Sequence, residues 1–273
     1  DGSPDDCLMI LREELGQLDF PAQLLAHSRN FGSFAAIRTG LRHTRGEYAA
    51  VLSADLQEPP DLLVDFFRSL EAGECDVAIG ARDGRNDPLL TGIASRIFWL
   101  TYRRLVVSEI PEGGVDVFGC NRAFRERLLE LEESRSSLVA LIFWLGFRRK
   151  IFTYRRLQRQ EGKSAWTLKK KFEYMNDSVY AFTDLPVRIL TRIGFIGILV
   201  SSILALAAVV ARLSGTIDVP GYTMTLLVVV FFGALNLLGL GIVGAYAWRA
   251  YENSKQRPQA LVAAKYDNEE GIN

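Results

Sequence analysis

Two long uncharged stretches dominate the hydrophobic pattern near the end of the chain. No charged residue lies between Arg192 and Arg212, or between Asp218 and Arg249. A helix needs about 20 apolar residues to cross a membrane, and both stretches reach that length. A buried helix this long without a polar face would be unusual. The pattern therefore predicts two transmembrane helices, at about residues 190–212 and 222–248.

The preceding residues, 1–165, alternate short apolar runs with amphipathic segments. Strands are expected at residues 23–26, 48–53 and 75–82, and helices at 5–15, 59–73 and 91–106. Further strands and helices are expected within 113–124 and 137–155. Such alternation is typical of an α/β domain with a mostly parallel sheet and helices on both faces. Ligands bind such sheets beyond the carboxyl ends of the strands, where Asp55 and Arg82 both lie.

A different helix is predicted at residues 166–185, just before the membrane region at 186–252. Its apolar positions recur at steps of three and four, at Leu168, Phe172, Met175, Val179 and Phe182. An amphipathic helix at this place fits the lipid interface. The alternative is a helix packed on the domain's own core. Residues 253–273 form a polar tail, which we expect to be loose and cytoplasmic.

The charge distribution orients the chain and narrows its partners. The formal net charge is zero, so a nucleic-acid partner is not expected. Lysines and arginines flank the outer ends of the predicted helix pair, whereas the connection "RLSGTIDVPGY" holds one Arg and one Asp. The positive-inside rule then places both ends, and the α/β domain, in the cytoplasm. The three cysteines include no C-x-x-C pair, so neither a zinc cluster nor a disulfide framework is predicted.

The stretch "SADLQEPP" carries the strongest candidate chemistry. Asp55 and Gln57 lie two positions apart, just past a predicted strand and before a helix that Pro59 and Pro60 open. Carboxylate and amide oxygens are hard ligands that suit Mg²⁺ or Mn²⁺. Mg²⁺ usually keeps one or two protein ligands and takes the rest from phosphates and water. The alternative is that Asp55 only caps the helix.

A set of short motifs resembles family 2 glycosyltransferases, and more closely those that glycosylate polyprenyl phosphates, such as dolichyl-phosphate mannose synthase and bacterial undecaprenyl-phosphate sugar transferases. The motifs are "DGSPDD", "SRNFG", "SADLQEPP", "IGAR", "RQEGKSAW", "FTDLP" and "GIVGAYAWRAYENSKQRP". They follow the family's order and cover nearly the whole chain. The resemblance implies a GT-A fold and an inverting transfer from a UDP- or GDP-linked sugar to a polyprenyl phosphate, with undecaprenyl phosphate favoured. It also implies a multi-pass protein of the bacterial plasma membrane and a homo-oligomer.

On the donor side, the resemblance assigns residues one by one. Asp1 and Ser3 match the end of the family's first nucleotide-binding motif, and Arg29 and Ser53 join them as donor-binding candidates. In the D-x-D-x-Q metal motif, Asp55 and Gln57 match the metal-holding positions, and Ser53 replaces the first Asp. Either a tolerated variant or a loss of activity would explain Ser53. The family's first strands have no counterpart, so the resemblance implies an N-terminally truncated chain.

On the acceptor side, the resemblance calls for positive charge, because Arg holds phosphate oxygens in a bidentate fork. Arg159, Lys163 and Ser164 lie in "RQEGKSAW", which resembles the family's acceptor-phosphate loop. Arg96 is a further acceptor candidate, and Arg82 is assigned a catalytic role beside Asp55. For each of these arginines, the alternative is a solvated surface charge.

Two rival functions stay open. A processive polysaccharide synthase would share the fold and the membrane anchor, but it should carry a Q-x-x-R-W motif, and the chain has none. A non-catalytic, membrane-anchored nucleotide-sugar-binding protein is favoured by Ser53 and by the absent first strands.

Overall fold

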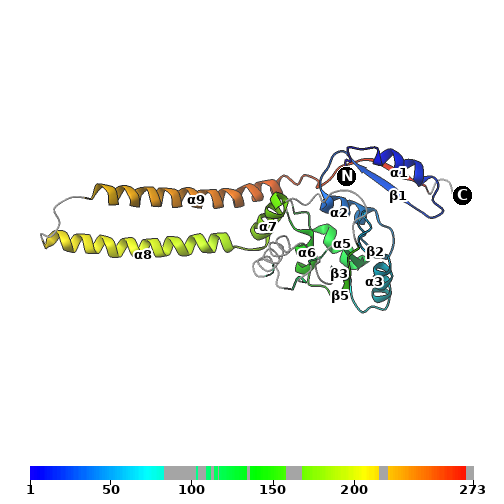
Figure 1. The fold of residues 1–273 in the computed structure, drawn as a ribbon, viewed down its shortest axis with the longest axis horizontal. Coiled ribbons are helices and arrows are strands. Elements are labelled where there is room, and N and C mark those ends of the chain that lie inside the picture. The colour runs from blue at the N-terminus through cyan, green and yellow to red at the C-terminus, as the bar shows by residue number, and fades with distance from the viewer. Residues whose placement is uncertain are drawn as a thin grey trace.

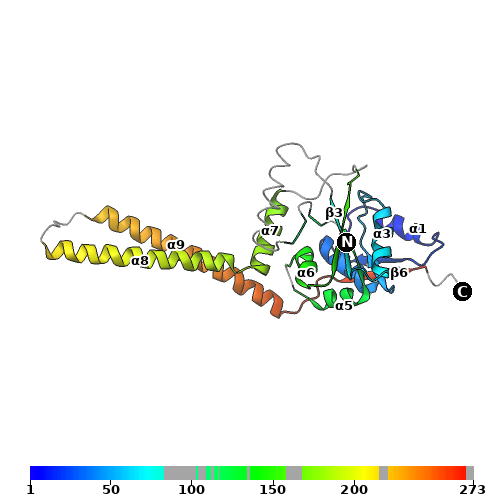
Figure 2. The same cartoon turned by 90° about the horizontal axis from the view of Figure 1, so that it is seen from below.

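The computed structural model describes residues 1–82, 103, 109–111, 114–115, 117–133, 136–157, 168–214 and 221–268. They form an α/β domain from which two long helices, α8 and α9, project together (Figures 1 and 2). A short helix, α7, lies where this pair meets the domain. The α/β class that the sequence predicted is confirmed.

A four-stranded sheet forms the centre of the domain. Its order is β2 (Tyr48–Ala50), β4 (Val117–Asn121), β3 (Val77–Arg82) and β5 (Arg149–Tyr154). β3 and β5 are parallel, whereas β4 runs antiparallel to both β2 and β3. The described sheet is therefore mixed rather than mostly parallel, because the period-two pattern of a strand carries no information about its direction. β2, β3 and β5 still point the same way, so their carboxyl ends share one edge.

Helices cover both faces of this sheet, as the sequence predicted. α3 (Asp61–Glu71) packs Leu62, Phe66 and Leu70 against one face. α5 (Arg122–Glu130) and α6 (Leu138–Trp144) pack against the other face, together with α2 (Ser33–His43). Successive strand residues alternate between the two cores: Val77 and Ile79 join one, and Ala78 joins the other.

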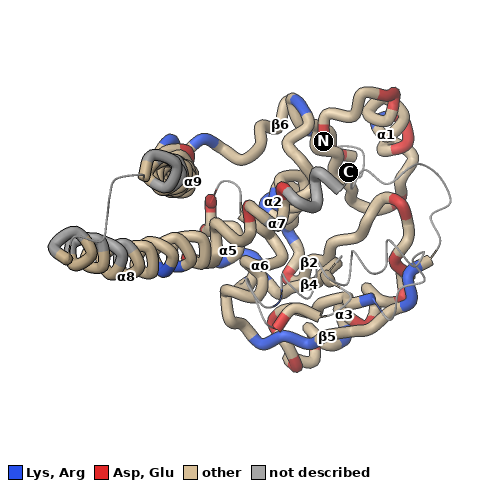
Figure 3. Tube along the Cα trace, turned by 60° about the vertical axis from the view of Figure 1, so that its left-hand side comes forward, with Lys and Arg blue, Asp and Glu red and all other residues tan. Residues whose placement is uncertain are grey.

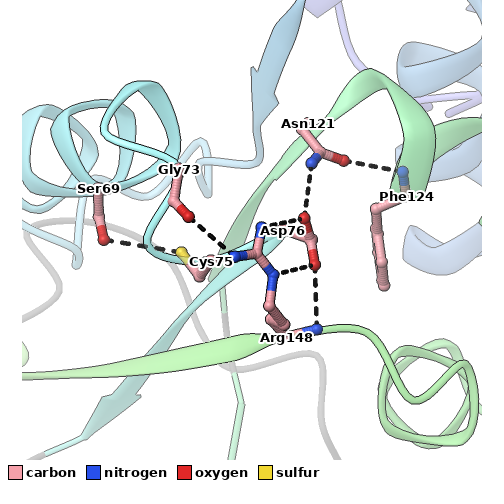
Figure 4. A network of polar contacts seen from close by, with 7 residues as sticks. All are labelled: Ser69, Gly73, Cys75, Asp76, Asn121, Phe124 and Arg148. Carbon is pink, nitrogen blue, oxygen red and sulfur yellow. Dashed lines mark hydrogen bonds and ion pairs between the residues drawn. The ribbon is translucent and has the colours of Figure 1, made fainter.

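A polar network ties together the edge of the sheet where β3 and β5 begin (Figure 4). The Asp76 carboxylate accepts hydrogen bonds from the Arg148 side chain at 3.0 and 3.1 Å, and from the Arg148 backbone N–H at 3.2 Å. Asn121 also donates to Asp76, and its Oδ1 caps α5 by accepting from the Phe124 N–H at 2.9 Å. Arg148 reaches the Gly73 carbonyl as well, at 3.0 Å. One network thus fixes the starts of β3, β5 and α5.

A separate two-stranded sheet joins β1 (Gln23–His27) to β6 (Val262–Asp267), which pair antiparallel. α1 (Cys7–Leu15) accompanies this sheet, and the Arg12 guanidinium lies over the Tyr266 ring. The Asn268 side chain closes the sheet by bonding the backbone of Leu18, Phe20 and Ala22. The expectation of a loose tail is therefore wrong for β6, whose partner strand lies far away in the sequence.

α7 (Leu168–Phe182) packs on the domain core through one face. The Tyr174 and Ser137 hydroxyls are 2.5 Å apart, and Phe34 lies against the Tyr174 ring. Ser178 is buried, and Phe182 also contacts the core. Of the two alternatives that the sequence left open, core packing holds for this face of α7.

α8 (Leu185–Leu213) and α9 (Tyr222–Ser254) form an antiparallel hairpin. Gly197 of α8 lies against Phe232, and Gly239 of α9 lies against Leu190, so each glycine makes room for a large side chain of the other helix. The charged positions that Figure 3 colours on α8 and α9 lie toward the domain end of the pair. Within the described residues, the 24-residue segment Phe231–Ser254 is the one helical stretch long and apolar enough to cross a membrane. A second span along α8 stays a prediction.

Candidate active site

The loop that follows β2 lies at the edge where β2, β3 and β5 end. The Val51 N–H still bonds the Phe118 carbonyl, at 2.9 Å, and the chain then turns. Leu56 adopts φ +50°, the left-handed region that branched and bulky side chains rarely occupy, although its side chain is exposed. Such backbone strain persists only where the surroundings enforce it, and it clusters at functional sites. Here the strained residue separates Asp55 from Gln57.

Asp55 and Gln57 have different surroundings. The Asp55 side chain is 24% exposed, and its Oδ1 accepts from the Gln57 N–H at 3.4 Å. Gln57 is buried, and its Nε2 donates to the Leu157 carbonyl at 3.1 Å. The Leu157 N–H donates in turn to the Gln57 carbonyl at 2.8 Å. These two bonds fasten the segment after β5 to the loop after β2, across 100 residues of sequence.

Two residues that the sequence analysis did not select complete this cluster. Glu58 is buried, with 1% of its side chain exposed, and the Tyr154 hydroxyl donates to its Oε1 at 3.5 Å. The Arg156 guanidinium lies near both carboxylates, 3.9 Å from Asp55 Oδ2 and 3.9 Å from Glu58 Oε1. A signal was present in the sequence: Arg156 follows the buried Tyr154 by two positions, so both project from the same face of the chain.

At the end of β1, Asp1 holds the loop that carries Arg29. Its carboxylate accepts from His27 Nδ1–H at 2.9 Å, from the Phe31 N–H at 2.9 Å and from the Gly32 N–H at 2.8 Å. His27 Nε2 accepts from the Thr39 hydroxyl at 2.9 Å. Burial lowers the pKa of His27, which favours the neutral ring.

The remaining donor-side candidates lie around this loop and the one after β2. Gly2 has φ +61°, and a Cβ there would fall 2.3 Å from the Arg29 backbone, so only glycine allows this approach. The Arg29 guanidinium covers the Phe31 ring at 4.1 Å, and Ser3 is exposed. Ser53 is partly buried, and its carbonyl accepts from the Leu56 N–H. The structure thus gives Asp1 a loop-holding contact, and its donor-binding role stays a prediction.

Arg82 ends β3 and lies opposite Tyr154 in the parallel pair with β5. Because Tyr154 contacts Glu58, Arg82 belongs to the same edge of the sheet as the Asp55 cluster. The acceptor-side candidates Arg96, Arg159, Lys163 and Ser164 lie outside the described residues, so their roles stay predictions.

Comparison with known proteins shows the family of the chain. Residues 1–131 match the family described as Glycosyl transferase family 2. The Bacillus subtilis (strain 168) protein CsbB, which is described as a glycosyltransferase, is 34% identical over 262 residues, covering 96% of this chain and 79% of the relative. The chain belongs to glycosyl transferase family 2. The Synechocystis glycosyltransferase sll0501 is 27% identical over 96% of this chain and 82% of its own length. The bactoprenol glucosyl transferase of Shigella phage SfX is 26% identical over 97% of this chain and 87% of its own length.

The cluster of this glycosyltransferase fits a divalent cation that a diphosphate helps to hold. Asp55 offers the hard oxygens of a partly exposed carboxylate on a strained turn, and Gln57 could add its amide oxygen. Within the described residues, no group of three or more His, Cys, Asp or Glu side chains converges on a common point. A zinc-type cage built from three or four protein side chains therefore does not fit the described part of the site. A cation of the Mg²⁺ type does, because it takes most of its ligands from phosphate and water.

Proposed function

We propose that this glycosyltransferase moves a sugar from a nucleotide-sugar to a polyprenyl phosphate, with inversion at the anomeric carbon. The observation that carries the proposal is Asp55, presented on a strained turn at the edge where three strands end. Two relatives from Shigella phages SfX and SfV, each 26% identical, are named bactoprenol glucosyl transferase, which supports a prenyl acceptor and favours undecaprenyl phosphate.

In this mechanism, Asp55 and Gln57 would hold Mg²⁺ or Mn²⁺ against the diphosphate of the donor. The cation supplies Lewis-acid neutralisation of the departing nucleoside diphosphate when it is bound. The two bonds between Gln57 and Leu157 keep the loop after β2 in place while the charge develops. Positioning of this kind accounts for much of the acceleration in transfers that need little covalent help from the protein.

The reaction needs no strong general base. An oxygen of the acceptor phosphate, already ionised near neutral pH, attacks the anomeric carbon and forms the new C–O bond. The bond to the diphosphate oxygen breaks, and its electron pair leaves with the nucleoside diphosphate. Arg82, Arg96, Arg159 and Lys163 would offset the repulsion between the two phosphates, and Ser164 would add a hydrogen bond to the acceptor.

The membrane brings the two substrates together. The segment Phe231–Ser254 would anchor the enzyme, and α8 would add a second span. The basic residues at the domain end of the pair favour a cytoplasmic active site. The soluble donor, UDP- or GDP-linked, would then meet the lipid phosphate at the bilayer surface.

A transfer assay tests this function directly. Membranes that contain the protein, supplied with undecaprenyl phosphate and radiolabelled nucleotide-sugars, should form a labelled lipid only when Mg²⁺ or Mn²⁺ is present. Asp55→Asn should remove the product while leaving the amount of membrane-inserted protein unchanged. Donor binding by calorimetry without transfer for any sugar would contradict the proposal and favour the non-catalytic alternative.

A further inference from the structure

The Arg156 guanidinium takes part in an incomplete charge cluster. Its Nη2 lies 3.9 Å from Asp55 Oδ2, and its Nε lies 3.9 Å from Glu58 Oε1. Both distances are within the range of an ion pair but too long for a hydrogen bond. Arg156 is therefore attracted to two carboxylates and bonded to neither.

Two buried atoms in this cluster lack a hydrogen-bond partner among the residues that the structure describes. They are Glu58 Oε2 and Arg156 Nε. Buried polar atoms are nearly always bonded, and leaving one unbonded costs free energy. A modest movement of the guanidinium toward Glu58 would satisfy both atoms at once, because a carboxylate accepts the guanidinium fork in a bidentate geometry.

Only the side chain of Arg156 is free to make this movement. The next residue, Leu157, is fixed to Gln57 by two backbone-directed bonds, and the preceding strand ends at Tyr154 in register with β3. The Tyr154 hydroxyl also holds Glu58 from the buried side. The backbone therefore stays fixed while the guanidinium moves between Asp55 and Glu58.

A cation on Asp55 and a guanidinium near the same carboxylate repel each other. At these separations the repulsion is appreciable, because the site is partly shielded from water: the Arg156 side chain is 31% exposed and Glu58 is buried. Binding of the cation should thus push Arg156 away from Asp55. Among the described residues, Glu58 is a carboxylate within reach that would receive it.

We propose that Arg156 competes with the divalent cation for Asp55, and that Glu58 is a positioning residue that takes the guanidinium when the cation binds. The inference rests on the proposed function, because it requires Asp55 to hold the cation. It predicts opposite effects for two neighbouring residues: losing Arg156 strengthens cation binding, and losing Glu58 weakens it.

Mn²⁺ titration of the purified full chain, followed by the EPR signal of free Mn²⁺, measures this competition without turnover. Arg156→Gln should bind Mn²⁺ about threefold to tenfold more tightly than the unmodified protein, and Glu58→Gln more weakly by a similar factor. Arg155→Gln is the matched control, since it removes the same charge at an exposed neighbouring position and should leave the affinity unchanged. Glu58→Asp should restore part of the affinity.

The double variant Glu58→Gln/Arg156→Gln separates positioning from simple charge. If Glu58 acts through Arg156, the double variant should bind Mn²⁺ as tightly as Arg156→Gln alone. If Glu58 only adds negative charge near the cation, the weakening should persist in the double variant, and the inference is overturned. Weaker or unchanged binding by Arg156→Gln overturns it as well.

The same preparations distinguish this failure from failure of the proposed function. Asp55→Asn should abolish Mn²⁺ binding. If it does, and the unmodified protein transfers sugar while Arg156→Gln binds Mn²⁺ normally, the competition is wrong and the function stands. If Asp55→Asn binds Mn²⁺ like the unmodified protein, Asp55 is not the cation ligand and both fail.

Discussion

The strands β3 and β5 have an arginine–carboxylate cluster at each end, and the two clusters differ in nearly every respect. Where the strands begin, Asp76 accepts three hydrogen bonds from Arg148 and one from Asn121, all between 3.0 and 3.2 Å. Where they end, Arg156 stays 3.9 Å from each of its two carboxylates. The first cluster is saturated, and the second has unbonded buried atoms.

The difference separates structural charge from functional charge. The hydrogen bonds from Arg148 lower the pKa of Asp76, so its carboxylate is stabilised in the ionised form. These hydrogen bonds within the folded chain already satisfy the charge of Asp76, so little of it is left for a ligand. At the other edge, Asp55 and Arg156 retain electrostatic potential that a charged ligand could use. Substitutions should therefore affect stability at the edge where β3 and β5 begin, and sugar transfer at the edge where they end.

The largest expected effect is that of Asp55→Asn on transfer. It should lower the rate of sugar transfer by at least about 1,000-fold, because the neutral amide would hold the cation poorly and leave the departing diphosphate unneutralised. The thermal midpoint should stay within about 1 °C of the unmodified protein, since the Asp55 side chain is partly exposed and asparagine keeps its size and an oxygen that can accept from the Gln57 N–H. Asp65→Asn, on the exposed face of α3, is the matched control. A large drop in midpoint would mean that Asp55 stabilises the fold as Asp76 does, and the two clusters would then not differ in role.

Asp76→Ala should have the opposite profile. Removing the carboxylate leaves Asn121 and the Arg148 backbone N–H without their acceptor, at a cost of about 2 kcal/mol, or about 4–8 °C in thermal midpoint. We assign little of this loss to charge attraction, because Arg148 is 64% exposed and screened by water. Transfer per folded molecule should be unchanged. If Asp76→Ala slows transfer in fully folded protein, the division between the two edges is wrong.

The pH dependence of the stability lost in Asp76→Ala follows from the sign of the shift in the pKa of Asp76. The folded pKa of Asp76 lies below its unfolded value of about 3.9, so its contribution is fully present above that value. It disappears as the pH falls through the folded pKa. The difference in midpoint between the unmodified protein and Asp76→Ala should accordingly be constant from pH 8 to about 5 and shrink below about 4. A difference that grows in acid would contradict this assignment.

The sequence indicated Asp55 and Gln57 but not Arg156 and Leu157, the residues that lie beside them in the fold. Asp55 and Gln57 were predictable because a strand, a turn and a helix start are local patterns. Arg156 and Leu157 meet them only through the fold, across 100 residues of sequence. The pairing of β1 with β6, and the reversed direction of β4, were missed for the same physical reason. Pairing and direction depend on tertiary packing, whereas local patterns reveal only which residues form a strand.

Replacing Arg148 or Arg156 by lysine tests whether the two arginines differ in how firmly they are bonded. Arg148→Lys loses the bidentate contact with Asp76, because an ammonium cannot reproduce the planar fork, and should lower the thermal midpoint by about 2 °C. Arg156→Lys should leave the midpoint unchanged, since the native side chain makes no close bond to either carboxylate. Differential scanning fluorimetry of both variants in one detergent checks the contrast. Equal losses would show that Arg156 is bonded as firmly as Arg148.

The smallest expected effect is that of Asn121→Ser, which divides the two contacts of one side chain. Serine is as good an N-cap as asparagine, so the bond from the Phe124 N–H to residue 121 should survive. The bond from Asn121 Nδ2 to Asp76 is lost, because the serine side chain is too short to reach the carboxylate. The expected cost is about 0.5 kcal/mol, seen as a thermal midpoint about 1–2 °C lower, with transfer unchanged. Asn121→Ala, which removes both contacts, should cost about twice as much. Equal losses for the two variants would mean that the bond to Asp76 carries nearly all of the contribution of Asn121 and that capping of α5 adds nothing.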